Sequence, residues 1–254
     1  MKLALFSDLH IELDQEDGWQ PPVLDADLIF LAGDIGIFPT SLEWASRTFR
    51  AWSGRIVYVA GNHEYYGTHF NPMAGLHSEY IAEGITLLER NTLELPGVRI
   101  LGCTLWSGFD LHGTDRIDVS MAIIRNSIND YRLIRNQGEL RLDPRDTLAL
   151  HTESVQWLDR ELAKPFDGKT MVLTHFAPHR NCVPSQFEGS SLSPYFVTDL
   201  AWLTEKHHID FWCYGHTHTN IEFVAGNGCR VVSNQRGYMH ELCEGFRPDR
   251  VIEL

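Results

Sequence analysis

The side chains most able to do chemistry in this sequence are aspartate, asparagine and histidine residues that follow short apolar runs. They are Asp8, His10, Asp34, Asn62, His175, His216 and His218. Their carboxylate, amide and imidazole groups form a borderline-hard set of ligands, which suits Mn, Fe, Zn or Co. The set is larger than one tetrahedral ion needs, whereas two ions that share a bridging carboxylate use all of it.

A pair of metal ions predicts a particular kind of reaction. Two ions about 3.5–4 Å apart act on phosphate esters, because together they stabilise the attacking and leaving oxygens. A water molecule that bridges them loses a proton at neutral pH and becomes a hydroxide nucleophile. Each motif alone has a structural explanation, since Gly61-Asn62-His63-Glu64 fits a turn and a single His175 fits a buried hydrogen bond. Their order, with each motif after an apolar run, favours one shared site.

The elements that must position these residues are short strands alternating with helices. Apolar runs with the pattern of strands buried on both faces cover residues 2–6, 28–31, 56–59, 171–173 and 211–214. Helical spacing of apolar residues falls at 41–52, 77–83, 147–163 and 198–207. The alternation predicts an α/β layered fold, in which ligands bind beyond the carboxyl ends of the strands. The metal-ligand candidates follow those ends, so we expect them to converge at one edge.

Two stretches depart from the alternation. Residues 221–254 contain β-like pieces and no convincing helix, which predicts that part of the sheet is antiparallel. Residues 106–145 carry apolar side chains at helical spacing from Ile117 to Ile128. We expect this insertion to pack over the body beside the site, because about 40 residues would not bury a core of their own. Residues 1–254 are therefore expected to form a single domain.

Composition restricts the partners and the compartment. Lys and Arg total 21 and Asp and Glu total 34, so the net charge is 21 − 34 = −13, which argues against binding to duplex nucleic acid. The five cysteines are scattered and form no C-x-x-C pair, which fits a reducing cytosol. The apolar run after Met1 is too short for a signal peptide, and no stretch approaches the ~20 apolar residues of a membrane span. We expect a cytoplasmic protein without membrane association, and composition predicts no oligomeric state.

The combined motifs resemble the calcineurin-like metallophosphoesterase superfamily over residues 8–218. They are Asp8-Leu9-His10, Gly33-Asp34, Gly61-Asn62-His63-Glu64, His175 and Gly215-His216-Thr217-His218. The resemblance implies a four-layer α/β/β/α sandwich of two mixed sheets with flanking helices. It also implies that one metal is held by Asp8, His10 and His218, and a second by Asn62, His175 and His216. Asp34 would bridge the two ions, and His63 would act near the leaving group as general acid or help to hold the phosphate.

Departures from the resemblance bear on the substrate. Protein serine/threonine phosphatases of the superfamily carry arginines after the Gly-Asp and Gly-Asn-His motifs, whereas here Asp34 and His63 are followed by Ile35-Gly36-Ile37-Phe38 and Glu64-Tyr65-Tyr66. The pattern looks more like the small bacterial-type phosphodiesterases and phosphatases. Candidate substrate contacts are Arg180, Tyr131 and Asn129, with Arg180 able to bind a phosphate through two hydrogen bonds. Asp14 and Glu64 are candidates to orient ligand imidazoles.

Three functions remain open from the sequence. The leading interpretation is a phosphodiesterase that acts on a small phosphorylated compound. The second is a phosphomonoesterase or nucleotide pyrophosphohydrolase with the same two-metal site. The third is a noncatalytic metal-binding scaffold, which the presence of every expected ligand and of His63 disfavours. The sequence does not choose among Mn, Fe and Zn for the metals.

Overall fold

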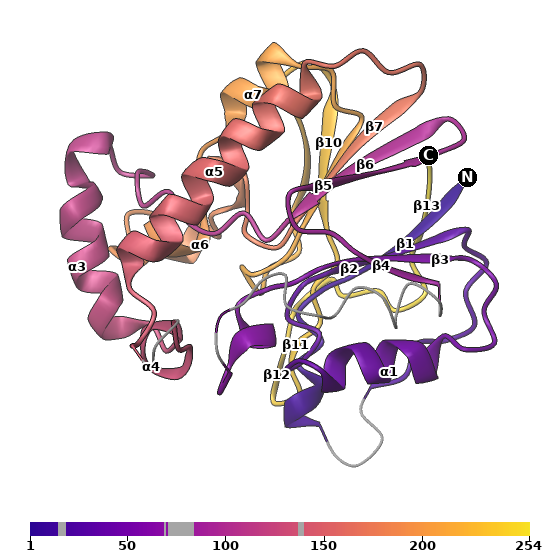
Figure 1. The fold of residues 1–254 in the computed structure, drawn as a ribbon, viewed down its shortest axis with the longest axis horizontal. Helices are drawn as coiled ribbons and strands as arrows, with labels where there is room; N and C mark the ends of the chain where they lie inside the picture. Colours follow the sequence, from indigo (N-terminus) through magenta and orange to yellow (C-terminus); the bar gives the residue numbers. More distant parts are fainter. Residues whose placement is uncertain (15–18, 69, 71–83, 137–139) are drawn as a thin grey trace.

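The computed structural model describes residues 1–14, 19–68, 70, 84–136 and 140–254. Its strands form two large sheets and one short hairpin sheet (Figure 1). The first sheet has the order β13-β1-β2-β3-β4. Its strands are β1 (Lys2–Phe6), β2 (Leu28–Ala32), β3 (Arg55–Val59), β4 (Ile85–Leu87) and β13 (Val251–Glu253). β1 to β4 run parallel, and β13 pairs antiparallel with β1.

The second sheet has the order β5-β6-β7-β8-β10-β9. Its strands are β5 (Asn91–Leu95), β6 (Val98–Cys103), β7 (Lys169–Thr174), β8 (Phe211–Tyr214), β9 (Glu222–Ala225) and β10 (Cys229–Ser233). The pairs β5–β6 and β9–β10 are antiparallel and the others are parallel. The short hairpin joins β11 (Gly237–Tyr238) to β12 (Glu241–Leu242). The antiparallel pairing expected for residues 221–254 is confirmed.

The two large sheets pack face to face because their strands alternate between two apolar faces. Leu3 and Leu5 of β1 lie in a core shared with Met171 and Leu173 of β7. The intervening residues of β1 belong instead to a core with the helix α1 (Thr40–Thr48). Fully burying each of these side chains stabilises the fold by about 1.5–3 kcal/mol. A one-residue slip in strand pairing would turn these side chains to the wrong face, so the register, and with it the position of each strand end, is strongly specified.

Helices cover the outer faces of both sheets, which completes the expected four-layer α/β/β/α sandwich (Figure 1). The first sheet is covered by α1 (Thr40–Thr48), and the second chiefly by α5 (Pro144–Leu162), whose Leu158 and Leu162 share a core with Val172 and Trp212. Shorter helices are α3 (Ile117–Ser127), α4 (Asp130–Leu133), α6 (Ser193–Phe196) and α7 (Ala201–Lys206). Single 3-10 turns are η1 (Ile11–Leu13), η2 (His63–Tyr65), η3 (Thr114–Arg116), η4 (Arg180–Cys182) and η5 (Ser185–Phe187).

Helix boundaries differ from the expected ones for local reasons. α5 begins earlier than residue 147 because Asp143 caps it and Asp146 closes a capping box. α7 is shorter than residues 198–207 because the N–H groups of Thr198 and Leu200 donate to the carbonyls of residues 177 and 178. The expected helix at 77–83 lies outside the described residues. Within the described residues, no helix is long and apolar enough to cross a membrane.

The described part of the inserted segment, residues 106–136 and 140–145, packs on the second sheet. Met121 and Ile124 of α3 join the same apolar core as the outer face of that sheet. The link between α3 and α4 then carries Asn129 and Asp130 to the wall of a cavity of about 820 Å³. Asn129 and Asp130 of the insertion therefore lie beside the site.

Candidate metal centre

The expected metal ligands all follow strand ends on one side of the two sheets. Asp8, Asp34 and Asn62 follow the parallel strands β1, β2 and β3. His175 and His216 follow the parallel strands β7 and β8 of the second sheet. The face-to-face packing of the sheets brings these two sets of side chains together.

The backbone at this edge is strained. Positive φ angles of 53°, 48°, 52°, 73° and 48° occur at Asp8, His10, Asp34, His216 and His218. Left-handed backbone at a residue other than glycine costs on the order of 1–3 kcal/mol, and such strain gathers at functional sites. Hydrogen bonds between neighbouring loops stabilise it: the Asp8 N–H donates to the Gly33 carbonyl at 3.0 Å, and the His10 N–H donates to the Asp34 carbonyl at 3.1 Å.

Two motif glycines are required by close approach of the ligand carboxylates. A Cβ atom on Gly61 would overlap the Asp34 carboxylate. One on Gly215 would overlap the Ser7 hydroxyl and come within 2.6 Å of the Asp8 carboxylate. Only glycine leaves room for these side chains at the strand ends.

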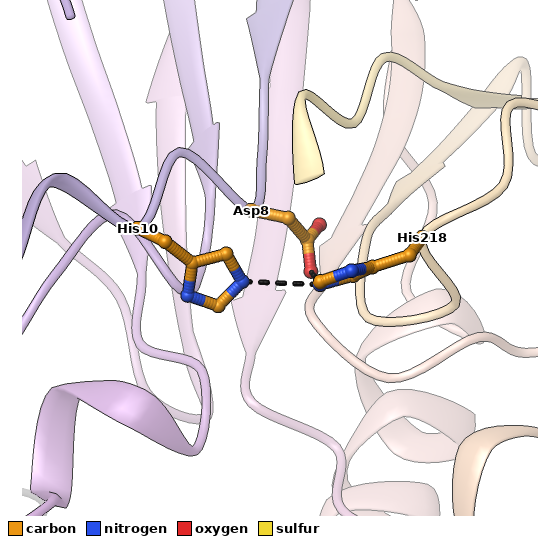
Figure 2. Close-up of side chains that lie close together, drawn as sticks. All are labelled: Asp8, His10 and His218. Atoms are coloured by element: carbon orange, nitrogen blue, oxygen red, sulfur yellow. Dashed lines mark hydrogen bonds and ion pairs between the residues drawn. The ribbon is translucent and has the colours of Figure 1, made fainter. Parts of the chain in front are cut away.

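One ligand group contains Asp8, His10 and His218, whose ligand atoms lie within 4.8 Å of one another. Figure 2 shows these three side chains pointing toward a common point, with Asp8 and His10 from the loop after β1 and His218 from the loop after β8. The His10 and His218 Nε2 atoms are 3.0 Å apart, and His218 Nε2 is 3.4 Å from an Asp8 oxygen. Such close imidazole nitrogens need a shared proton or a cation between them.

A second ligand group contains Asp34, His175 and His216, again within 4.8 Å. His175 Nε2 lies 3.4 Å from an Asp34 oxygen, 3.1 Å from His216 Nδ1 and 3.1 Å from Asn62 Oδ1. Its other nitrogen, Nδ1, is 2.8 Å from the Ala32 carbonyl. A proton on Nδ1 would satisfy that carbonyl and leave the Nε2 lone pair for a metal ion.

The electrostatics of the two groups favour cations. Burial works against charge on His175, but the Asp34 and Asp8 carboxylates outweigh it and raise the pKa of His175 to about 9. Burial works to raise the pKa of Asp34, yet the imidazoles of His175 and His63 hold it well below its ordinary value. His216 Nε2 is buried and has no hydrogen-bond partner among the described residues. Two buried carboxylates with converging nitrogens therefore fit a pair of bound metal ions.

His63 lies at the edge of the ligand cluster and faces the cavity. Its backbone N–H donates to an Asp34 oxygen at 2.8 Å, its Nδ1 is 2.9 Å from Glu12 Oε1, and its ring stacks on Tyr66. Burial opposes its protonation, but Asp34 and Glu12 outweigh burial and raise the pKa of His63 to about 9. Glu12 also lies 3.3 Å from His10 Nδ1, so it joins these two imidazoles in a third close group. Sequence reasoning missed Glu12, although its position two residues after His10 was a signal.

Asp130 ties the inserted segment to the ligand cluster. Its carboxylate accepts hydrogen bonds from Asn62 Nδ2 at 3.0 Å, from the Tyr66 hydroxyl at 2.8 Å and from the Tyr195 hydroxyl. Because the Asn62 amide nitrogen donates to Asp130, the Asn62 oxygen faces His175. Burial raises the pKa of Asp130. Asp130 is thus positioned to set the orientation of a ligand oxygen.

The expectation that Glu64 and Asp14 orient ligand imidazoles is corrected by their contacts. The buried Glu64 carboxylate accepts from the N–H groups of Asp34 at 2.9 Å and Gly61 at 2.5 Å, and thereby fixes the backbone of two motifs. Asp14 pairs with Arg236 at 2.7 Å instead. Both carboxylates act on elements that carry the ligands rather than on imidazole rings.

A cavity of about 820 Å³ opens above the ligand cluster. Its floor includes Asp34, Asn62, His63, His216 and His218, and its walls come from residues 127–130, 186–187, 195–196, 238 and 241–245. No Lys or Arg lines it among the described residues, and none of the remaining positions, 15–18, 69, 71–83 and 137–139, is Lys or Arg in the sequence. The charged side chains of its walls are acidic: Asp130, Glu241 and Glu244.

The expected substrate contacts are placed differently from one another. Asn129 lines the cavity. The Tyr131 side chain is buried, and its hydroxyl lies 3.0 Å from Thr147 of α5. Arg180 is largely exposed and pairs with Asp199. Neither Tyr131 nor Arg180 lines the cavity, so the expectation that they contact substrate is not carried forward.

Comparisons with known proteins agree with this geometry. The chain matches the family described as "Calcineurin-like phosphoesterase" over residues 1–220. It is 29% identical, over an alignment of 286 residues, to "Uncharacterized protein L509" of Acanthamoeba polyphaga mimivirus, with 99% of this chain and 96% of that protein covered.

Two solved structures share the fold. A phosphopantetheinyl hydrolase from Mycobacterium tuberculosis matches with a TM-score of 0.69 at 19% identity, covering 94% of this chain and 90% of the other. A dimetal phosphatase from Danio rerio matches with a TM-score of 0.55 at 13% identity, covering 94% and 88%. At these identities the similarity concerns the architecture.

Proposed function

We propose that this chain, which belongs to the calcineurin-like phosphoesterase family and is a metal-dependent phosphoester hydrolase, acts on a small organic phosphodiester. The observation that carries the proposal is the absence of Lys and Arg from the described cavity lining. A phosphomonoester or a pyrophosphate brings two or more negative charges, which enzymes neutralise with arginine or lysine clamps as well as metals. A phosphodiester brings one negative charge and needs less positive charge from the enzyme.

The acidic wall supports the same choice. Asp130, Glu241 and Glu244 face a cavity whose positive charge would come from bound metals alone. Like charges repel a second or third phosphate group more strongly than a single phosphodiester. The alternative of a phosphomonoesterase or nucleotide pyrophosphohydrolase is therefore disfavoured, although it would use the same metal ligands.

The geometry supports a division of the ligands between two ions. Asp8, His10 and His218 would hold one ion, Asn62, His175 and His216 would hold the other, and Asp34 would contribute to both. Mn, Fe or Zn suits this set. When bound, the ions neutralise phosphate charge and make an attacking water more acidic.

We assign to His63 the role of proton donor to the leaving oxygen. Its hydrogen bond to Glu12 fixes the ring through Nδ1 and leaves Nε2 for the substrate. The Asp34 carboxylate, which accepts from the His63 backbone, holds the residue beside the ligands. This arrangement would help to position the substrate and to stabilise charge, the main sources of catalysis in phosphoryl transfer.

The proposed setting is the cytoplasm. All five cysteines are free and buried, which fits a reducing compartment.

The test is hydrolysis of bis-p-nitrophenyl phosphate against p-nitrophenyl phosphate with added Mn²⁺, in wild-type protein and in His63→Ala. We expect a higher kcat/KM for the diester and loss of both activities in the variant. Monoester preference would favour the alternative function. Stoichiometric metal with no turnover of any phosphate ester would favour a noncatalytic scaffold. The similarity to a phosphopantetheinyl hydrolase makes phosphopantetheinyl compounds a sensible part of a subsequent screen.

A further inference from the structure

A second, apolar pocket adjoins the metal cavity. It has a volume of about 220 Å³ and is lined by side chains from residues 183–197 and by Thr217. Its apolar lining consists of Val183, Pro184, Phe187, Leu192, Phe196 and Val197. Phe187, Phe196 and Thr217 line both this pocket and the metal cavity, so the two spaces share a wall.

The hydroxyl groups around this pocket are already engaged within the protein. Ser193 Oγ donates to the Phe187 carbonyl at 2.8 Å, and Ser190 Oγ accepts from the Leu192 N–H at 3.3 Å. Thr217 Oγ1 accepts from Gln235 Nε2 at 3.0 Å. No charged side chain lines the pocket among the described residues. The surface offered to a ligand is therefore essentially apolar.

The pocket is connected to the metal ligands through Phe196. The Phe196 ring stacks on the His216 imidazole with the ring centres 5.0 Å apart. At the rim, the Phe187 side chain is 51% exposed, which leaves a large apolar group in water beside an apolar pocket. A ligand group seated between these two rings would remove that surface from water.

The size of the pocket limits its occupant. A dry apolar cavity of about 150 Å³ accommodates benzene, so a volume of about 220 Å³ holds one aryl ring or a short alkyl chain. We propose that this pocket binds an uncharged aryl or short alkyl group carried by one arm of the substrate while the phosphate lies on the metal ligands. The proposal rests on the proposed function for the phosphodiester itself and adds the chemistry of one ester arm.

Binding of phosphonate monomethyl esters tests the pocket independently of turnover. The probes are methyl methylphosphonate and methyl phenylphosphonate, which carry one negative charge each and differ only in the arm attached to phosphorus. Calorimetry on the Mn²⁺-loaded protein should give more than about tenfold tighter binding of the phenyl compound, since each buried methylene contributes about fourfold in affinity and burial of about two of the additional ring carbons suffices.

Variants localise the preference. Val183→Phe fills the pocket and should reduce the phenyl preference to within about twofold. Val224→Phe makes the same change on β9, where the side chain is 68% exposed and outside both linings, and should keep the preference. If Val183→Phe fails to fold, Phe187→Ala decides, because its half-exposed ring is not needed for the core and its loss should weaken only the phenyl compound.

The outcomes separate this inference from the proposed function. Equal binding of the two compounds to wild type, or an unchanged phenyl preference in both pocket variants, would overturn the proposal that this pocket binds one arm of the substrate. That conclusion would hold even if bis-p-nitrophenyl phosphate is hydrolysed. A phenyl preference abolished by Val183→Phe, in a protein that hydrolyses only phosphomonoesters, would support binding of an arm in the pocket and overturn the proposal of a phosphodiester substrate.

Discussion

The floor and the walls of the cavity are built in different ways. The floor is the set of lining residues 34, 62–63 and 216–218, with the buried ligands Asp8, His10 and His175 close to it, and the walls are residues 127–130, 186–187, 195–196, 238 and 241–245. The floor residues follow strand ends, and most of them are buried and held by backbone hydrogen bonds. The walls include side chains such as Phe187 and Leu242 that are 51% and 61% exposed. The backbone thus fixes the positions of the proposed metal ligands, whereas exposed wall side chains can change with little effect on the fold.

The strain in the floor sharpens this difference. Left-handed backbone at residues such as Asp8 and His216 persists because the two packed sheets over-determine it. No comparable requirement applies to an exposed wall side chain. We therefore expect floor variants to alter metal binding and rate, and wall variants to alter selectivity.

The largest effect is expected for Asp34→Asn. Removing the carboxylate proposed to bridge the ions should weaken both metals and lower kcat/KM by about 10⁴-fold or more. Metal content by mass spectrometry and diester hydrolysis measure the two effects. Asp25→Asn, a change at an exposed surface ion pair with Lys2, is the control. Full metal occupancy with normal turnover in Asp34→Asn would exclude Asp34 as the bridging ligand.

His63→Ala should separate rate from metal binding within the floor. Loss of a proton donor lowers kcat by about 10²–10⁴-fold, while both metals should remain because the imidazole is not among the assigned ligands. The control is His208→Ala, whose side chain is 73% exposed. Substantial metal loss in His63→Ala would contradict the division of roles.

Asp130→Ala tests whether a wall residue affects metal binding by a ligand on the floor. Without this carboxylate the Asn62 amide loses the acceptor that orients it. Affinity for the metal assigned to Asn62, His175 and His216 should fall by about 10–100-fold, and excess metal should restore most of the rate. Competition with a chelating dye measures the affinity. Asp118→Ala, at an exposed position in the same insertion, should bind metal like the wild type.

The smallest effect is expected for the exposed acidic wall. Replacing Glu241 and Glu244 together by Gln should narrow the diester preference over the monoester by about twofold to threefold, because exposed charges contribute only about 0.2–1 kcal/mol. The ratio of kcat/KM values at low salt measures it. The difference between variant and wild type should shrink at high ionic strength. A salt-independent difference would show that charge is not the cause.

The fold was predictable where local pattern is strong. The runs from which the ligands emerge are strands at nearly the expected residues, as in β1 and β8. β4, β5 and β6 were missed, although Pro96-Gly97 between two β-rich runs signals the β5–β6 hairpin. The missed strands carry no motif, so nothing in the ligand pattern pointed to them.

The sequence by itself determined the ligand types, their order and their position after strands, because these depend on residue identity and on short-range periodicity. Only the tertiary structure decided which side chains meet across long separations. Asp130 and Asn62 are 68 positions apart, and their hydrogen bond depends on how the insertion packs on the second sheet. Glu12 meets His63 across 51 positions in the same way, while Arg180 turns to Asp199. Local patterns set each strand end, but the packing of the layers sets the distance between them.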